Sequence, residues 1–303
     1  RACCCRRLQF SWRPMALRSS LPRIKPVARE RRAAGDSFTV DTATATLVRD
    51  ISRRAAWTLL LDGVESSHVD LDDPTVLEFE YVRWLGDIID CLAPAGDPVD
   101  TVHVGGGAMT LARYVMATRP ASDQIVLELD GALVELVRER LPWARGRSSR
   151  RLRVRVGDAS QAINGLADAS WDVVVRDAFR DAEVPASLRT VENASRVKRV
   201  LRPTGVYLMN VTDRAPFAVT GVELATLLEV FSDVAVISEP SVLRGRRHGN
   251  LIIAAANQPL PVEAIARRIA DGGVQGRVRD VGQATQLARG HRPFREADAG
   301  LLE

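Results

Sequence analysis

The sequence has few cysteines, few lysines, few aromatic residues and no long apolar run. Its four cysteines are Cys3, Cys4, Cys5 and Cys91, which form no CxxC pair and no spacing suited to zinc. We therefore expect no disulfide framework, no metal, and a reducing, cytoplasmic location. The longest apolar runs, such as 251–256, are far shorter than the roughly 18–20 residues that a membrane helix needs, so no membrane partner is expected.

The scarcity of lysine bears on how the basic charge is interpreted. Of the 42 basic residues, only Lys25 and Lys198 are lysines, and an arginine bias of this kind also follows from a GC-rich coding sequence. We therefore do not expect nucleic acid as a partner. Basic residues and prolines are concentrated near the start, which predicts a disordered basic tail over residues 1–36. This stretch lacks the apolar core and small-residue cleavage site of a secretory signal, so none is expected.

Short β-like stretches follow the predicted tail. Residues 38–42, 45–49 and 57–61 are rich in β-branched and large apolar side chains, and the Asp62-Gly63 turn leads to a further short strand at 66–69. These stretches predict a small antiparallel β domain over residues 37–75. Asp73 and Pro74 then predict the N-cap and first turn of a helix, because apolar residues from Val76 to Leu92 recur at helical spacing.

From residue 99 onward, strands alternate with helices, which predicts an α/β fold with a mostly parallel sheet. The last two strands are separated by a loop alone and should pair antiparallel. This is the pattern of a seven-stranded, methyltransferase-type Rossmann domain, which we place at 76–258, with an accessory helix at 262–270 and a weakly specified tail within 259–303. The seven strands are expected at 99–104, 124–129, 152–156, 171–175, 205–210, 234–238 and 250–255.

A glycine triplet follows the first of these strands and precedes a helix. Gly105, Gly106 and Gly107 allow a sharp turn and a close approach of a ligand to the backbone. Glu128 ends the next strand, where an acidic side chain can accept hydrogen bonds from ribose hydroxyls. The glycine spacing is not GxGxxG, so the pattern favours an adenosyl ligand over a dinucleotide.

Two more acidic residues end later strands. Asp158, with Ala159 beside it, follows the third strand, where a carboxylate can accept from an adenine amino group. Asp177 ends the fourth strand. Ligands of open α/β sheets bind outside the carboxyl ends of the strands, so we expect Glu128, Asp158 and Asp177 to point into one cleft. Glu128 could instead be a surface carboxylate at a strand end, and Asp177 could instead be a helix- or loop-capping aspartate.

Together these residues resemble the spermidine synthase (polyamine aminopropyltransferase) family over about 38–256, and the β hairpin with its Leu61-Asp62-Gly63 turn favours that family over ordinary methyltransferases. The resemblance implies that Gly105, Gly106, Gly107, Glu128, Asp158 and Ala159 hold decarboxylated S-adenosylmethionine, or S-adenosylmethionine, as a co-substrate. It implies that Asp177 accepts the proton of an attacking amine such as putrescine. Relatives usually form dimers, so a homodimer is a further expectation.

The resemblance is incomplete on the amine side. The family's aspartate after the glycine loop is Ala108 here, its glutamine after the hairpin turn is Ser66, and Arg180 lies in its aspartate-rich segment. The family's tyrosine at the start of the following helix has no clear match near 77–81. Two alternatives therefore stay open, a methyltransferase-like enzyme that acts on another nucleophile and a non-catalytic nucleoside-binding homologue.

Overall fold

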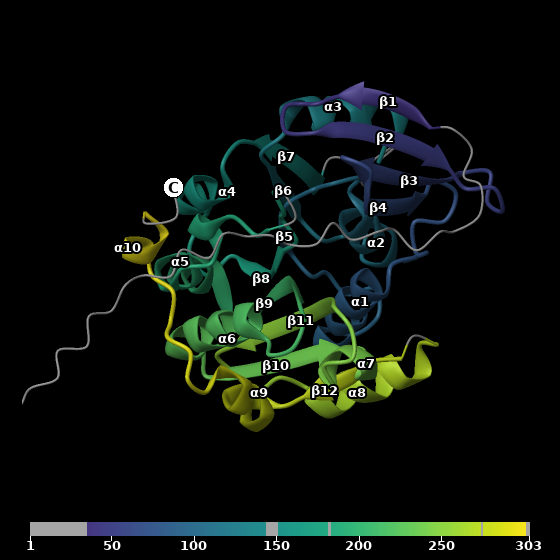
Figure 1. Ribbon diagram of the computed structural model, residues 1–303. Helices are drawn as coiled ribbons and strands as arrows, with labels where there is room; N and C mark the ends of the chain where they lie inside the picture. The colour runs from purple at the N-terminus through teal and green to yellow at the C-terminus, as the bar shows by residue number, and fades with distance from the viewer. Residues whose placement is uncertain (1–34, 144–150, 181–182, 274, 301–303) are drawn as a thin grey trace, which may run out of the picture. The chain divides into compact units, whose positions relative to one another are not determined.

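The computed structural model describes residues 35–143, 151–180, 183–273 and 275–300. The predicted tail at 1–36 lies almost wholly outside these residues. The described part begins with a four-stranded antiparallel sheet in the order β1-β2-β3-β4 (Figure 1). Its strands are β1 (Asp36–Thr39), β2 (Thr44–Arg49), β3 (Ala56–Leu61) and β4 (Val64–Asp70). The Asp62-Gly63 turn joins β3 to β4 as predicted, with both residues at positive φ.

The second sheet has eight strands in the order β12-β10-β11-β9-β8-β5-β6-β7. Strands β7, β6, β5, β8 and β9 are parallel, and β11 runs antiparallel to both β9 and β10. This confirms the predicted α/β, methyltransferase-type arrangement with its seven strands. They are β5 (Thr101–Val104), β6 (Gln124–Glu128), β7 (Leu152–Val156), β8 (Trp171–Arg176), β9 (Leu201–Asp213), β10 (Asp233–Ser238) and β11 (Gly249–Ala256).

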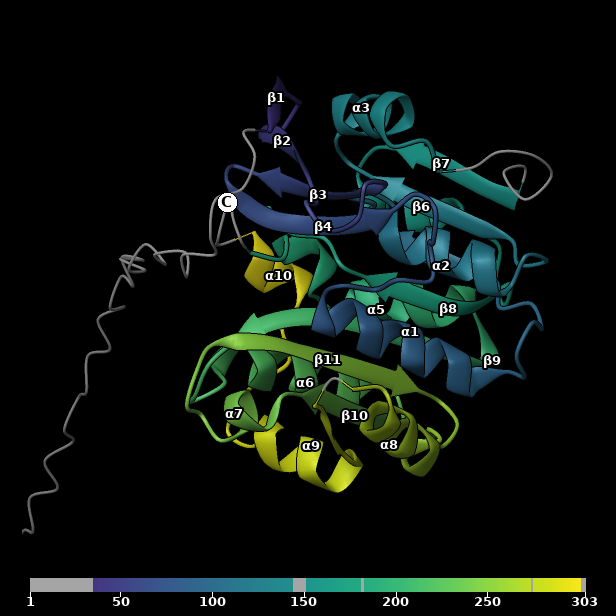
Figure 2. The ribbon, with the colours of Figure 1, turned by 90° about the vertical axis from the view of Figure 1, so that its right-hand side faces the viewer.

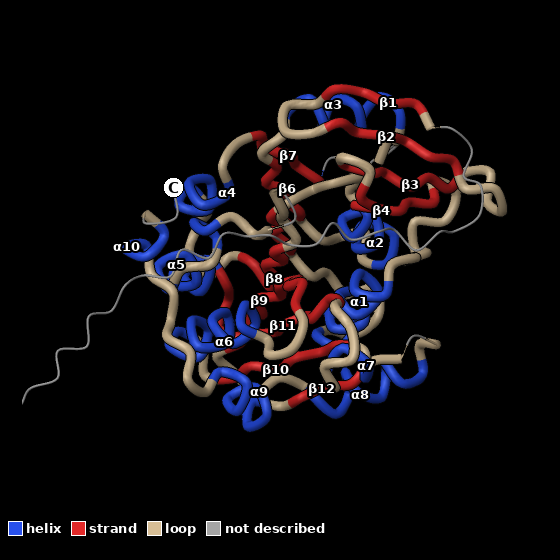
Figure 3. The backbone as a smooth tube through the Cα atoms, in the orientation of Figure 1, coloured by secondary structure: helices blue, strands red, loops and turns tan. Residues whose placement is uncertain are grey.

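Helices cover both faces of this sheet because its central strands are apolar on both sides (Figure 3). On one face, α1 (Glu80–Leu92), α2 (Thr110–Thr118) and α8 (Val262–Asp271) pack on β8, β9 and β11. On the other, α5 (Val191–Val200), α6 (Ala218–Val230) and α9 (Val281–Ala288) pack on the same strands. The remaining helical segments are α3 (Gly131–Arg140), α4 (Ala159–Ala162), η2 (Ile163–Gly165), η3 (Ala186–Leu188), α7 (Pro240–Leu243) and α10 (Glu296–Ala299).

The small sheet packs directly on the glycine-loop side of the large one. A third apolar cluster joins Leu47, Leu59 and Val69 of the small sheet to Met109 and Val126 of the large-sheet unit. Figure 2 shows β4 beside α2. The contacts place residues 33–303 in one compact unit, so the domain boundaries drawn from the sequence remain a proposal.

The first helix begins later than predicted. The α1 helix starts at Glu80, because the Asp73 side chain instead accepts hydrogen bonds from the backbone N–H (3.0 Å) and hydroxyl (2.6 Å) of Thr75. Such a bond closes a local turn and competes with a helix. Leu77 is buried, but it packs against α1 from the preceding segment. The apolar residues from Val76 onward therefore belong partly to a loop and partly to α1. Their helical spacing placed the start of the helix too early for this reason.

The end of the chain is more ordered than predicted. Beyond α8, the strand β12 (Arg277–Arg279) pairs with β10 and adds an eighth strand at the sheet edge. Residues after α9 cross α5 and α6, where Phe294 accepts a backbone hydrogen bond from Val191 (2.8 Å) and donates one to Thr226 (2.9 Å). Among the residues described, no helix is both long and apolar enough to cross a membrane.

Candidate active site

The glycine loop lies at the carboxyl end of β5, as predicted, and its backbone leaves no room for side chains. Gly105 has φ of +90°, and a Cβ there would stand 2.4 Å from the backbone oxygen of Asp177. Gly107 has φ of +48°, and a Cβ there would stand 2.4 Å from the Ser67 hydroxyl oxygen. Glycine avoids both the steric cost of positive φ and these collisions. The loop is thus fitted closely between β8 and β4.

Glu128 fixes the shape of this loop from the neighbouring strand. Its Oε2 accepts a hydrogen bond from the Gly106 backbone N–H at 2.7 Å, and its Oε1 accepts one from the Asp130 N–H at 3.0 Å. Each carboxylate oxygen has a further lone pair that can accept from a ligand. The predicted partnership of Glu128 with the glycine loop is therefore present as a direct contact, while its ribose role stays a prediction.

Asp158 lies farther along the same edge of the sheet. It is the N-cap of α4, and its Oδ1 accepts from the Ser160 backbone N–H and hydroxyl, each at 2.7 Å. Asp158 is exposed, Ala159 is half-buried, and neither lines the pocket described below. Two apolar side chains at the ends of neighbouring strands are also exposed, Leu129 after β6 (47%) and Val156 at the end of β7 (53%).

Asp177 follows β8 and is held by two side chains. Asn210 of β9 donates a hydrogen bond from Nδ2 to its Oδ1 at 2.9 Å, and the Tyr81 hydroxyl donates another. Burial raises the pKa of the Asp177 carboxyl, and these two hydrogen bonds oppose that shift. Burial and the nearby Asp177 charge raise the pKa of Tyr81 well above its ordinary value, so its hydroxyl keeps its proton and acts as a donor.

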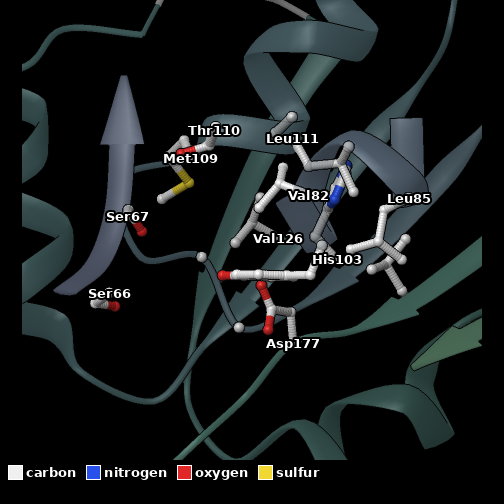
Figure 4. Close-up of a pocket in the computed structure, with 15 residues that line it drawn as sticks. Ser66, Ser67, Val82, Leu85, His103, Met109, Thr110, Leu111, Val126 and Asp177 are labelled. Atoms are coloured by element: carbon white, nitrogen blue, oxygen red, sulfur yellow. The ribbon is translucent and has the colours of Figure 1, made fainter. Parts of the chain in front are cut away.

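A pocket lies between the two sheets, with Asp177, Tyr81, Gly105 and Gly106 in its wall (Figure 4). Ser66 and Ser67 of β4 lie on one side of it, and His103 and Leu85 on the other. Of the three acids predicted to share one cleft, Asp177 lines this pocket, whereas Glu128 and Asp158 do not. Glu128 reaches it only through the backbone of Gly106.

The structure locates the three residues that differ from the family pattern. Ala108 is fully buried in the apolar cluster beneath β4, and its N–H donates to the Ser67 hydroxyl at 3.2 Å. Ser66 lines the pocket, as its place after the hairpin turn suggested. Arg180 is exposed and does not line the pocket, and its backbone pairs with that of Glu183. The described part of the pocket wall therefore contains no arginine.

Sequence reasoning missed Tyr81, Asn210 and His103. Tyr81 lies in the first turn of α1 and lines the pocket, but the sequence placed the start of that helix too early to single it out. Asn210 lies on β9, the parallel neighbour of β8, and this adjacency was a usable signal. His103 lies two residues before the glycine loop, on the β5 face opposite Val102 and Val104.

A comparison with protein-family models adds the deciding observation. The spermine/spermidine synthase domain model matches residues 78–234, which include the glycine loop, Glu128, Asp158 and Asp177. The chain belongs to the spermine/spermidine synthase family. Its relatives include a polyamine aminopropyltransferase from Aeropyrum pernix, 30% identical over 155 residues. That match covers 50% of this chain and 46% of the relative, so it spans about half of the length of that enzyme.

Solved structures of this family share the fold. A probable spermidine synthase from Corynebacterium glutamicum is 32% identical with a TM-score of 0.79, covering 87% of this chain and 97% of that one. The Thermotoga maritima spermidine synthase has a TM-score of 0.56 at 16% identity, covering 88% of this chain and 87% of that one. Human methyltransferase-like protein 13, solved with SAH, also shares the fold. It has a TM-score of 0.50 at 19% identity, and the match covers 72% of this chain and 96% of that one.

Proposed function

We propose that this protein transfers an aminopropyl group from decarboxylated S-adenosylmethionine to an amine. One observation carries the proposal: in a chain of the spermine/spermidine synthase family, Asp177 stands beside the glycine loop in a pocket, held by Tyr81 and Asn210. A spermidine synthase with a TM-score of 0.57 to this chain was solved with the transition-state analogue AdoDATO. At 16% identity, this similarity is evidence of a shared fold alone.

The nucleoside would lie along the carboxyl ends of β5, β6 and β7. The backbone of Gly105, Gly106 and Gly107 allows its close approach, and Glu128 would accept from the ribose hydroxyls. The exposed side chains of Leu129 and Val156 offer apolar surface for an adenine ring, and Asp158 would accept from the adenine amino group. Such apolar side chains at the ligand-binding edge of a sheet fit a flat aromatic base.

Asp177 is suited to act as the base. An amine attacks carbon only when it is neutral, because the ammonium ion has no lone pair. In the transfer, the nitrogen forms a bond to the aminopropyl carbon, and the bond from that carbon to the sulfonium breaks with its electron pair left on sulfur. The proton that the nitrogen then loses passes to the Asp177 carboxylate, whose raised pKa favours accepting it. The products are an aminopropylated amine and methylthioadenosine.

Mass spectrometry of a single incubation tests the proposal. The protein would be incubated with decarboxylated S-adenosylmethionine and a panel of amines, and in parallel with S-adenosylmethionine. The proposal predicts methylthioadenosine and an aminopropylated amine in equal amounts in the first reaction. Methylated amine in the second reaction alone would support the methyltransferase-like alternative, and nucleoside binding with no product in either would support a non-catalytic homologue. A homodimer and a cytoplasmic location stay predictions of the sequence.

A further inference from the structure

A short helical turn, η3, lies beside the sheet edge where the nucleoside would bind. It contacts α4, α5 and α10. The Leu188 side chain of η3 is buried in an apolar cluster, and Ala159 of α4 and Ala178 pack against the same cluster. Ala178 directly follows Asp177, and α4 is the helix that Asp158 caps. The position of η3 therefore bears on both the proposed base and the proposed adenine end of the site.

A network of side chains holds the end of η3. The Leu188 carbonyl accepts hydrogen bonds from Arg176 Nη1 at 3.0 Å and from Asn193 Nδ2 at 3.2 Å. Arg189 donates from Nε to Glu223 Oε1 at 2.9 Å, while Glu223 Oε2 accepts from Arg176 Nη1 at 3.1 Å. Arg176 is the last residue of β8, directly before the proposed base. The Glu223 carboxylate thus joins the end of β8 to the end of η3.

The end of the described chain lies against the same turn. We call residues 289–300 the C-terminal strap; they include α10, which contacts η3. The Phe294 ring of the strap stacks with the Arg189 guanidinium, whose central carbon is 5.5 Å from the ring centroid. The Glu296 N–H donates to the carboxylate of Glu192, in the first turn of α5, at 3.0 Å. Figure 1 shows α10 beside α5.

Arg189 belongs to both sets of contacts. Its planar guanidinium can donate to Glu223 and stack on Phe294 at the same time, which the point charge of a lysine cannot do. Glu223 does not need Arg189 as a counter-charge, because the almost fully buried Arg176 already balances it. What Arg189 adds is therefore a link between the C-terminal strap and η3.

Resting on the proposed nucleoside site, we propose that Arg189 is a positioning residue that couples the C-terminal strap to nucleoside binding. Arg189 does not line the pocket, so it acts through η3, which supports Ala159 and Ala178 in their shared apolar cluster. The coupling is reciprocal by thermodynamic linkage. A nucleoside that binds more tightly when η3 is held in place must itself hold the strap more firmly.

Hydrogen exchange of the wild-type protein tests the coupling without any transfer reaction, because amide exchange reports local opening. We would compare peptides that cover 289–300 with and without saturating methylthioadenosine, and use β2 as the reference. The N–H groups of Phe294 and Glu296 should exchange about fivefold more slowly with the nucleoside bound, the lower end of typical coupling between sites. Unchanged exchange in the strap with methylthioadenosine bound would overturn the inference.

Variants at Arg189 locate the effect. Arg189→Met keeps an apolar stem and removes both the ion pair and the stacking, so the Kd for methylthioadenosine should rise about fivefold and the protection of the strap should be lost. Arg189→Lys keeps the charge and should give an intermediate Kd. Arg49→Met is the matched control, since Arg49 stacks on Trp57 in the small sheet at 5.2 Å. A wild-type Kd in Arg189→Met, with the strap still protected, would contradict the proposed role.

The readouts separate this inference from the proposed function. Methylthioadenosine binding that neither protects the strap nor depends on Arg189 would reject the coupling and leave aminopropyl transfer standing. Coupled binding in a protein without transfer activity would keep the inference and reject the proposed reaction, whereas no binding to the wild-type protein would reject both. Should Arg189→Met fail to fold, hydrogen exchange of the wild-type protein still decides the question.

Discussion

The Tyr81 hydroxyl donates a hydrogen bond to the Asp177 carboxylate across the pocket between the two sheets. Tyr81 is in the first turn of α1, and Asp177 follows β8 almost a hundred residues later. This contact joins the helix that follows the small sheet to the ligand-binding edge of the large one. Because a hydrogen bond to the ionised form lowers a carboxyl pKa, Tyr81 helps to keep Asp177 ionised despite its burial.

Replacing Asp177 with asparagine should remove the proposed base while keeping its shape. We expect Asp177→Asn to lower kcat by about 10²- to 10⁴-fold, the usual contribution of a positioned base, with the nucleoside Kd unchanged. Steady-state kinetics and calorimetry would measure the two quantities. Asp168→Asn is the matched control, since Asp168 is 72% exposed and its ion pair with Arg199 is at the surface. Full activity in Asp177→Asn would reject this residue as the base.

The pH dependence of transfer should follow the Asp177 pKa. Transfer needs the ionised carboxylate, so kcat at saturating amine, which the ionisation of the free amine does not affect, should fall as the pH drops through this pKa. Because burial raises it, the acid limb of the profile should lie above the range of an ordinary aspartate. Tyr81→Phe removes a hydrogen bond that lowers this pKa, so its acid limb should move to higher pH. An unchanged or lower limb in the variant would show that Tyr81 does not tune Asp177.

Glu128→Ala should weaken nucleoside binding. It removes the acceptor of the Gly106 and Asp130 N–H groups and the proposed acceptor of the ribose hydroxyls. Because hydrogen bonds to charged groups contribute about 1.5–3 kcal/mol, the Kd for decarboxylated S-adenosylmethionine should rise about 10- to 100-fold. Calorimetry would measure this, with Glu139→Gln at a 73% exposed position as the control. An unchanged Kd would show that Glu128 does not contribute to nucleoside binding.

A buried ion-pair cluster on the other face of β8 should matter for stability. Glu223 of α6 is 3.1 Å from Arg176 and 2.9 Å from Arg189, and both Arg176 and Glu223 are almost fully buried. Glu223→Gln leaves the buried Arg176 guanidinium without its counter-charge, which should lower the free energy of unfolding by about 3–5 kcal/mol. Urea unfolding would measure the loss. Glu229→Gln, on the same helix at a 38% exposed position, should change it by less than about 1 kcal/mol.

The sequence predicted the large sheet well because its central strands are short, apolar and separated by helices with regular spacing. The sequence-based prediction was wrong where local hydrogen bonds or very short elements decide the structure. The Asx turn at Asp73 displaces the start of α1, and β12 is only three residues long, too short for a periodic signal. The glycine loop and Glu128 were predictable from their spacing, but the contact of Tyr81 with Asp177 depends on how α1 packs, which no local pattern encodes.

For the part of the site that would bind the amine, the sequence indicated only which residues of the family pattern are absent. Ala108 is fully buried inside an apolar cluster beneath β4, where a charged side chain would be strongly disfavoured. The pairing of Arg247 with Glu80 and Glu239 joins a loop to the start of α1 over more than 150 residues. Contacts of this range follow from the fold and are not visible in the sequence pattern.

A titration of the wild-type protein with decarboxylated and ordinary S-adenosylmethionine tests whether it has a binding site for an aminopropyl donor. The two ligands differ by one carboxylate on the group that would lie toward Asp177, where a second negative charge is unfavourable. For a donor site of this kind, calorimetry should give a Kd at least about tenfold lower for the decarboxylated form, a difference of about 1.4 kcal/mol. Equal or tighter binding of ordinary S-adenosylmethionine would contradict an aminopropyl donor site in this protein.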